Sequence, residues 1–218
     1  MSSRFRRWRL DGTPRRAHDV LRLLARRQPG RAPEPTAAVI DSQSAKSAGA
    51  GGPARGYDGG KRVKGRKRHI PVDALGLLLA VCVHAADVQD RAGARLLVDA
   101  VADDALPRLG VVWADHGYTG PFADWLHDAR GWRVEAVRRP ARQLWRYGYE
   151  ARPARTFRVL PRRWVVERTF AWLGQSRRLS RDYERLPPTS EAMIYGAMSR
   201  LMLRRLTASP LAAAPVGV

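Results

Sequence analysis

Two short apolar runs, each followed by an aspartate, constrain the fold of this chain most. The first is AAVI before Asp41, and the second is LGVVWA before Asp115. Short apolar runs bounded by polar or turn-forming residues are typical of buried strands. A loop rich in Ser, Ala and Gly follows Asp41, and a turn that contains glycine follows Asp115. Each aspartate is therefore expected to stand at the C-terminal edge of its strand.

The remaining segments alternate between strand and helix patterns. Two β-rich runs flank Ala74–Gly76 within His69–Ala85 and predict an antiparallel hairpin, whereas residues 42–60 are expected to form a mobile loop. Apolar residues at helical spacing predict helices at Pro14–Arg27, Asp90–Ala102, Phe122–Arg130, Arg162–Arg178 and Thr189–Leu206, and a further strand is expected at Trp132–Val137. This order predicts an α/β fold with a mixed sheet flanked by helices.

The charge of the chain indicates a polyanionic partner. With 40 Lys and Arg against 20 Asp and Glu, the net charge is +20 over 218 residues. The longest apolar run is too short to span a bilayer, and no signal peptide is recognisable, so no membrane association and a cytoplasmic location are expected. A single cysteine, Cys82, excludes an intrachain disulfide and a multi-cysteine zinc site.

The helix predicted at Arg162–Arg178 contains a single carboxylate, Glu167. At helical spacing, Val165, Val166, Thr169, Phe170, Trp172 and Leu173 form one apolar face, and Glu167 lies on the strip beside that face. One interpretation is an ordinary ion pair between Arg163 and Glu167 at positions i and i+4. The other is a functional carboxylate at the edge of the core.

Asp41, Asp115 and Glu167 together suggest a metal site. The C-terminal ends of strands gather at one edge of an α/β sheet, so the two aspartates are expected to meet there. Clustered carboxylates repel one another unless a divalent cation neutralises them, and ligands that are all oxygen favour Mg²⁺ or Mn²⁺. Two such ions suit the in-line displacement of a phosphodiester. The alternative is that both aspartates only form turns with the residues after them.

Two segments are candidates for contact with nucleic acid. The basic run KRVKGRKR is expected to contact phosphates unless it is only a solvated charged segment, and the aromatic residues of the irregular segment before Arg162 could stack on unpaired bases or lie buried. These candidates are Lys61, Arg62, Lys64, Arg66, Lys67 and Arg68 in the run, and Trp145, Tyr147 and Tyr149 in the irregular segment. Gly60 and Lys61 do not end a P-loop, because Arg55 replaces its first glycine and Arg62 its Ser or Thr. The four histidines other than His116 show no spacing typical of metal ligands.

Four segments resemble the transposases of the insertion sequence five group, a family of bacterial DDE transposases. They are AVIDSQSAKS, GYDGGKRVKGRKRHIPVDALGLLLAV, VVWADHGYTG and RRWVVERTFAWLGQSRRLSRDYE, in that order. The resemblance implies an RNase H-like fold in which Asp41, Asp115 and Glu167 are the catalytic residues. These three carboxylates are expected to bind two Mg²⁺ or Mn²⁺ ions. It also implies that Arg163 accompanies the catalytic glutamate. The chain departs from the related signature at Leu160 and Gly174, where a tyrosine and a basic residue are expected, so Arg177 or Arg178 would supply the missing DNA contact.

The resemblance also implies an activity and a domain organisation. The activity is metal-dependent cleavage of insertion-sequence ends and strand transfer to target DNA, by a homo-oligomer assembled on double-stranded DNA near the bacterial nucleoid. The expected domains are a basic helical segment at 1–36, a catalytic domain at 37–207 and a disordered tail at 208–218. Most of the family's N-terminal domain is expected to be missing, which suggests a truncated copy or a partner encoded in an upstream frame. The alternatives are an inactive DNA-binding remnant and a metal-dependent nuclease without strand transfer.

Overall fold

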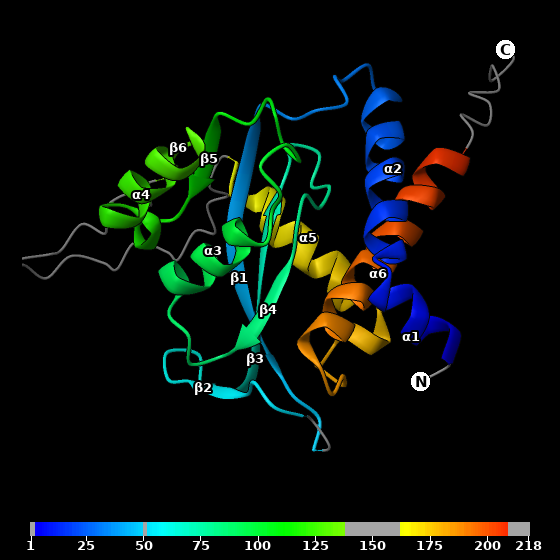
Figure 1. Ribbon diagram of the computed structural model, residues 1–218, viewed down its shortest axis with the longest axis vertical. Coiled ribbons are helices and arrows are strands. Elements are labelled where there is room, and N and C mark those ends of the chain that lie inside the picture. Colours follow the sequence, from blue (N-terminus) through cyan, green and yellow to red (C-terminus); the bar gives the residue numbers. More distant parts are fainter. Residues whose placement is uncertain (1–2, 50–51, 138–161, 209–218) are drawn as a thin grey trace, which may run out of the picture.

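A mixed β-sheet with helices on both faces forms the centre of the computed structural model, which describes residues 3–49, 52–137 and 162–208 (Figure 1). The strands are β1 Ala37–Lys46, β2 Gly56–Asp58, β3 Val63–Val72, β4 Cys82–Ala85, β5 Val111–Ala114 and β6 Arg133–Ala136. The helices are α1 Ser3–Leu10, α2 Thr13–Arg27, α3 Asp90–Asp99, α4 Pro121–Arg130, α5 Trp164–Gly174 and α6 Pro187–Thr207, with short 3-10 turns η1 His116–Tyr118 and η2 Arg177–Leu179.

Strand β1 lies in the middle of the sheet and determines its topology. The strand order is β2-β3-β1-β5-β6, and β4 pairs with β3. Strands β1, β3 and β4 pair antiparallel, whereas β5 and β6 continue the sheet parallel to β1. This is the mixed α/β sheet that the order of elements predicts and is consistent with the RNase H-like fold that the resemblance implies, so the predicted fold class is confirmed.

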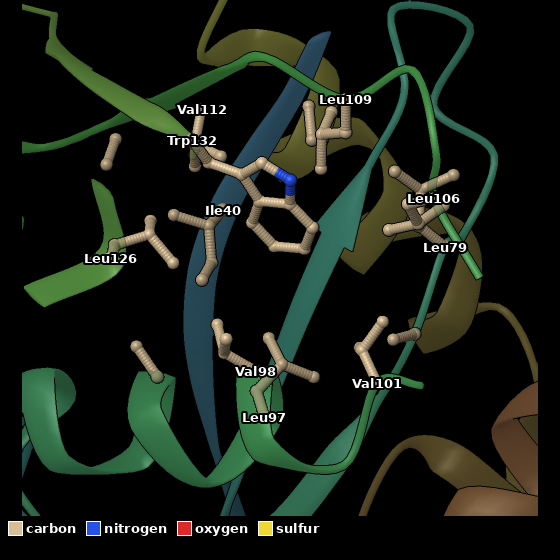
Figure 2. Close-up of a cluster of buried hydrophobic side chains, with 14 of the residues drawn as sticks. Ile40, Leu79, Leu97, Val98, Val101, Leu106, Leu109, Val112, Leu126 and Trp132 are labelled. Atoms are coloured by element: carbon tan, nitrogen blue, oxygen red, sulfur yellow. The ribbon is translucent and has the colours of Figure 1, made fainter. Parts of the chain in front are cut away.

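Each face of the sheet is covered by a separate hydrophobic core. Because side chains of a strand alternate between faces, Ala38 and Ile40 of β1 pack into one core and Val39 packs into the other. The first core lies under α3 and α4 and includes Leu97, Leu126 and Trp132 (Figure 2). The second lies under α5 and α6. Burial on both faces explains why β1 begins with a continuous apolar run.

The N-terminal helices pack against the C-terminal one. Helix α2 lies along α6 (Figure 1), and Ala25 shares a small core with Leu77 and Met202. Arg26 forms a buried ion pair with Asp73. A helix of this length is marginal in isolation, so its packing on α6 stabilises it. The predicted domain limits at 36 and 207 stay predictions.

One prediction about local structure was wrong, and a second was right except for where its first strand begins. The segment after Asp41 is not a loop, because β1 continues to Lys46 and pairs with β3 over Ser42–Lys46, and a second strand, β2, follows within the predicted loop. The predicted hairpin is confirmed, but its first strand, β3, begins at Val63, inside the basic run. Backbone pairing with β3 therefore makes a strand of the polar sequence SQSAK.

Some predictions concern residues outside the described ranges. These are the aromatic candidates Trp145, Tyr147 and Tyr149, the signature position Leu160, and the tail beyond Ala208. Within the described ranges, no helix is long and apolar enough to cross a membrane.

Candidate active site

The parallel pairing of β1 and β5 brings Asp41 and Asp115 to the same place in the sheet. This pairing ends with Val39 opposite Trp113. Asp41 follows two residues later within β1, and Asp115 follows two residues later, directly after the end of β5. Asp115 keeps an extended backbone, with φ −79° and ψ 173°. Val39 belongs to the core under α5 and Trp113 packs against it, so strand alternation directs both aspartates to that face.

Asp41 is a largely buried carboxylate with two fixed partners. Its Oδ1 accepts a hydrogen bond from the Ser42 amide at 2.8 Å, and its Oδ2 accepts one from Arg163 Nη2 at 3.1 Å. Burial raises the pKa of Asp41, the Ser42 N–H and the Arg163 charge act in the opposite direction, and the negative charge of Asp115 adds to the rise. Asp41 therefore pairs with the cation at the N-cap of α5, and the negative charge of a second carboxylate, Asp115, acts on it.

Asp115 also has a local structural role. Its Oδ1 accepts a hydrogen bond from the Gly117 amide at 2.8 Å and caps the short turn η1. The turn predicted as an alternative role of Asp115 is thus present. The second oxygen of the carboxylate makes no hydrogen bond to any described residue, so this turn leaves it available to a ligand.

Glu167 lies on the exposed side of α5, as its position beside the apolar face predicts. Val165, Val166, Phe170 and Leu173 are buried, whereas Glu167 forms neither an ion pair nor a side-chain hydrogen bond with any described residue. The alternative of an Arg163–Glu167 ion pair was wrong. Arg163 is 5% exposed and directs its guanidinium to Asp41 instead.

The three carboxylates do not converge on one point. In the described part of the chain, no three Asp, Glu, His or Cys side chains are close enough together to hold a metal ion. Asp41 and Asp115 supply the oxygen ligands that Mg²⁺ or Mn²⁺ prefers, and their like charges favour a cation between them. These two aspartates therefore fit a divalent ion, and Glu167 would have to approach them to join its coordination.

Half of the basic run is part of the protein interior, which corrects the prediction that all of it contacts phosphates. Arg66, Lys67 and Arg68 are at most 6% exposed. Arg66 pairs with Asp182 at 3.3 Å, and Arg68 donates to the carbonyl oxygens of residues 179 and 181 at 2.7 and 3.1 Å. These arginines fasten the segment after α5 to the sheet.

Other predicted DNA contacts remain on the surface. Lys61, Arg62 and Lys64 are exposed at the beginning of the hairpin, as are Arg177 and Arg178 in η2. Arg178 also pairs with Glu184 at 2.7 Å. Arg163 is not a surface cation, because it is buried against Asp41.

A buried chain of hydrogen bonds behind Asp115 was missed from the sequence. His84 Nδ1 lies 2.8 Å from the carbonyl oxygen of Ala85, so this nitrogen carries the proton and Nε2 is an acceptor. His69 Nδ1 lies 2.7 Å from that Nε2, and His69 Nε2 lies 3.2 Å from the Tyr118 hydroxyl. His69 is therefore a donor to His84 and an acceptor from Tyr118, in the turn that Asp115 caps.

Burial keeps this histidine pair neutral. It lowers the pKa of His69 to about 3, with the neighbouring His84 as a smaller cause. Helix α3 approaches closely here, since a Cβ on Gly93 would lie 2.3 Å from His84 Nε2. The signal in the sequence was the position of both histidines on the two arms of one hairpin, where cross-strand contact is expected.

Comparison with known proteins agrees with this architecture. The family model described as "Transposase DDE domain" matches residues 32–202, and the chain belongs to this family. A relative from Burkholderia cepacia is described as "Putative transposase for insertion sequence element IS402". It is 33% identical over 146 residues, which is 63% of this chain and 60% of the relative. The match thus spans less than two thirds of the relative's own length.

Proposed function

We propose that this protein cleaves the ends of an insertion sequence and transfers the freed DNA strands to target DNA. The observation that carries the proposal is the register of β1 and β5, which supports a site formed by Asp41 and Asp115 under the helix that bears Glu167. Family membership supports DNA as the substrate. In this proposal the protein acts as a homo-oligomer on the element ends.

Asp41, Asp115 and Glu167 would hold Mg²⁺ or Mn²⁺, in the two-ion arrangement expected for phosphodiester chemistry. When bound, the ions would activate the attacking hydroxyl and stabilise the leaving oxygen. Arg163 holds Asp41 in place and keeps its partly desolvated negative charge compensated before a substrate binds. The DNA backbone would be positioned by phosphate contacts from the exposed cations Lys61, Arg62, Lys64, Arg177 and Arg178. Arg177 or Arg178 would replace the cation missing at Gly174.

A strand-cleavage assay tests the proposal. Purified protein is incubated with labelled element ends and a target plasmid, in Mg²⁺ or EDTA, beside Asp115→Asn and Glu167→Gln. Asp103→Asn is the matched control, because this carboxylate is 97% exposed and lies away from the site. We expect wild type and Asp103→Asn to give nicks and joined products in Mg²⁺. We expect Asp115→Asn and Glu167→Gln to give neither. Cleavage that persists in EDTA or in Asp115→Asn would reject the assigned site.

A DNA-binding role without cleavage is the second candidate. The separation of Glu167 from the two aspartates favours it, because the described carboxylates do not form a complete metal site. Binding to element ends without nicks under any metal condition would support this candidate. Nicks without joined products would instead indicate a nuclease.

A further inference from the structure

A groove rich in arginine runs along α5 and α6. It consists of two adjoining cavities with volumes of about 580 and 410 Å³, within the size range of ligand pockets. Trp164, Arg168 and Arg205 line the first cavity, where α2 and the residues before β4 also contribute. Trp172, Arg200, Arg204 and Arg205 line the second. No aspartate or glutamate among the described residues lines either cavity.

Aromatic rings hold two of these arginines in place. The guanidinium carbon of Arg168 lies 4.3 Å from the ring centre of Trp164 and 4.6 Å from that of Trp172. Arg205, from α6, lies 4.5 Å from the same Trp172 ring. Arg168 Nη2 donates to the Leu75 carbonyl at 3.0 Å, while its Nε has no partner among the described residues. Stacked guanidinium groups are planar donors whose orientation is already fixed.

The positive charge of the groove is compensated only in part, since the charge of Asp73 raises the pKa of Arg168 and Arg205 against the effect of burial. None of Arg168, Arg200, Arg204 and Arg205 forms an ion pair with a described carboxylate. Burial lowers the pKa of Arg205, and the charge of Arg168 lowers it further. The nearby Asp73 is fully buried and already paired with Arg26. The dipole of α6 suits cations in its last turn but does not account for Arg168 on another helix.

We propose that this groove binds the sugar–phosphate backbone of DNA, with phosphates between Arg168 of α5 and the three arginines of α6. The inference rests on the proposed DNA substrate and adds a second contact surface to it. Trp164, Arg168 and Trp172 follow one another at intervals of four residues along α5, and Glu167 lies on the adjacent strip of the helix. A DNA strand in the groove would therefore run along the helix that also carries Glu167. The guanidinium groups of Arg168 and Arg205 are half-buried. The narrow sugar–phosphate backbone of DNA can enter the groove to reach them, whereas a flat membrane surface cannot.

Salt-dependent DNA binding tests the groove. Fluorescence anisotropy of a labelled 30-base-pair duplex is measured in EDTA at several salt concentrations, for wild type, for Arg168→Gln and for a triple variant with Gln at 200, 204 and 205. The slope of log K against log salt is negative, and each lost phosphate contact should reduce its magnitude by about 0.9. The slope of the triple variant should therefore be smaller in magnitude than that of wild type by about 2 to 3. Arg95→Gln is the matched control, because Arg95 stacks on Trp125 at 4.9 Å on the opposite face of the sheet.

A triple variant with the affinity and slope of wild type would overturn the proposal. So would equal loss of binding in Arg95→Gln, or tighter binding to anionic lipid vesicles that the same triple variant abolishes. Thermal melts by circular dichroism identify a folding defect in Arg168→Gln, and the exposed Arg200 and Arg204 keep the groove testable in that case. The cleavage assay separates this inference from the proposed function. A smaller salt slope in the triple variant, together with normal cleavage by Asp115→Asn, would support the groove and reject the active site. An unchanged salt slope in the triple variant, together with loss of cleavage in Asp115→Asn, would reject the groove alone.

Discussion

Removal of the Arg163 guanidinium should destabilise the protein in a way that depends on the charge of Asp41. In wild type, Arg163 Nη2 lies 3.1 Å from Asp41 Oδ2, and the two side chains are 6% and 19% exposed. Arg163→Gln leaves a buried carboxylate without its cation, which typically costs about 3 to 5 kcal/mol. We expect a loss near the lower value at neutral pH, because Asp41 still accepts the Ser42 amide.

The loss of stability caused by Arg163→Gln should be smaller at acidic pH. Burial already raises the folded-state pKa of Asp41, and loss of Arg163, which lowers that pKa, raises it further. A carboxyl group with a raised folded-state pKa favours folding when protonated, and this contribution is lost as the pH rises through that pKa. The difference between wild type and Arg163→Gln should therefore be small when Asp41 is protonated in both and grow as the pH increases. Mg²⁺ should also reduce it if the ion binds Asp41.

Urea unfolding at a series of pH values, with and without Mg²⁺, measures this difference. The matched control is Arg133→Gln, which breaks an exposed pair with Glu135 at 3.0 Å and should cost less than about 1 kcal/mol. Equal costs for the two variants at neutral pH would refute the claim that Arg163 compensates a buried charge. A cost for Arg163→Gln that does not change with pH would assign it to lost packing.

Three further predictions concern the buried polar residues. Arg66→Met should cost about 3 to 5 kcal/mol in urea unfolding, because both Arg66 and its partner Asp182 are fully buried; a cost below 1 kcal/mol would contradict this account. Gly93→Ala should destabilise by about 1 to 3 kcal/mol because its Cβ would overlap the histidine pair, whereas Gly196→Ala, with no atom near the new Cβ, should stabilise by up to about 1 kcal/mol; the same sign for both would refute the contact. Burial lowers the pKa of His69 to about 3, so neutral His69 contributes to stability above pH 6.5 and this contribution is lost as the pH falls toward about 3. The free energy of unfolding of wild type should therefore fall more steeply over this pH range than that of His69→Gln. Parallel pH profiles of the two proteins would argue against a neutral buried His69.

The strands and helices with strong apolar periodicity could be predicted from the sequence. Helix α4 and strand β6 were expected within a residue or two of their observed limits, because their apolar spacing decides their conformation locally. The second half of β1 could not be predicted in this way. Its sequence SQSAK is polar, and it forms a strand because β3 supplies backbone partners over Ser42–Lys46. Such pairing is a property of the sheet and leaves little trace in the segment itself.

The candidate site was predictable to a similar extent. The ends of two apolar runs indicated that Asp41 and Asp115 would meet, and the register of β1 and β5 agrees with that expectation. The partner of Arg163 was not predictable from helical spacing, which favoured Glu167 at i+4 over Asp41, 122 residues away. Burial of the arginine decides between them, because a buried guanidinium gains more from a buried carboxylate than from an exposed one.

The net charge of +20 overstates the positive surface that is free to contact DNA. In β3, Arg66 donates to Asp182 and to a carbonyl group of the segment after α5, and Arg68 donates to two further carbonyl groups of that segment. Arg163 donates to Asp41. The basic run therefore acts in part as a clamp within the fold, although its composition alone indicates a phosphate-binding strip. The arginines of α6 show the opposite relation, since they are dispersed in the sequence yet share one groove with Arg168. A salt slope that responds to the α6 arginines would thus locate DNA binding where three-dimensional proximity, not local charge density, places the unpaired cations.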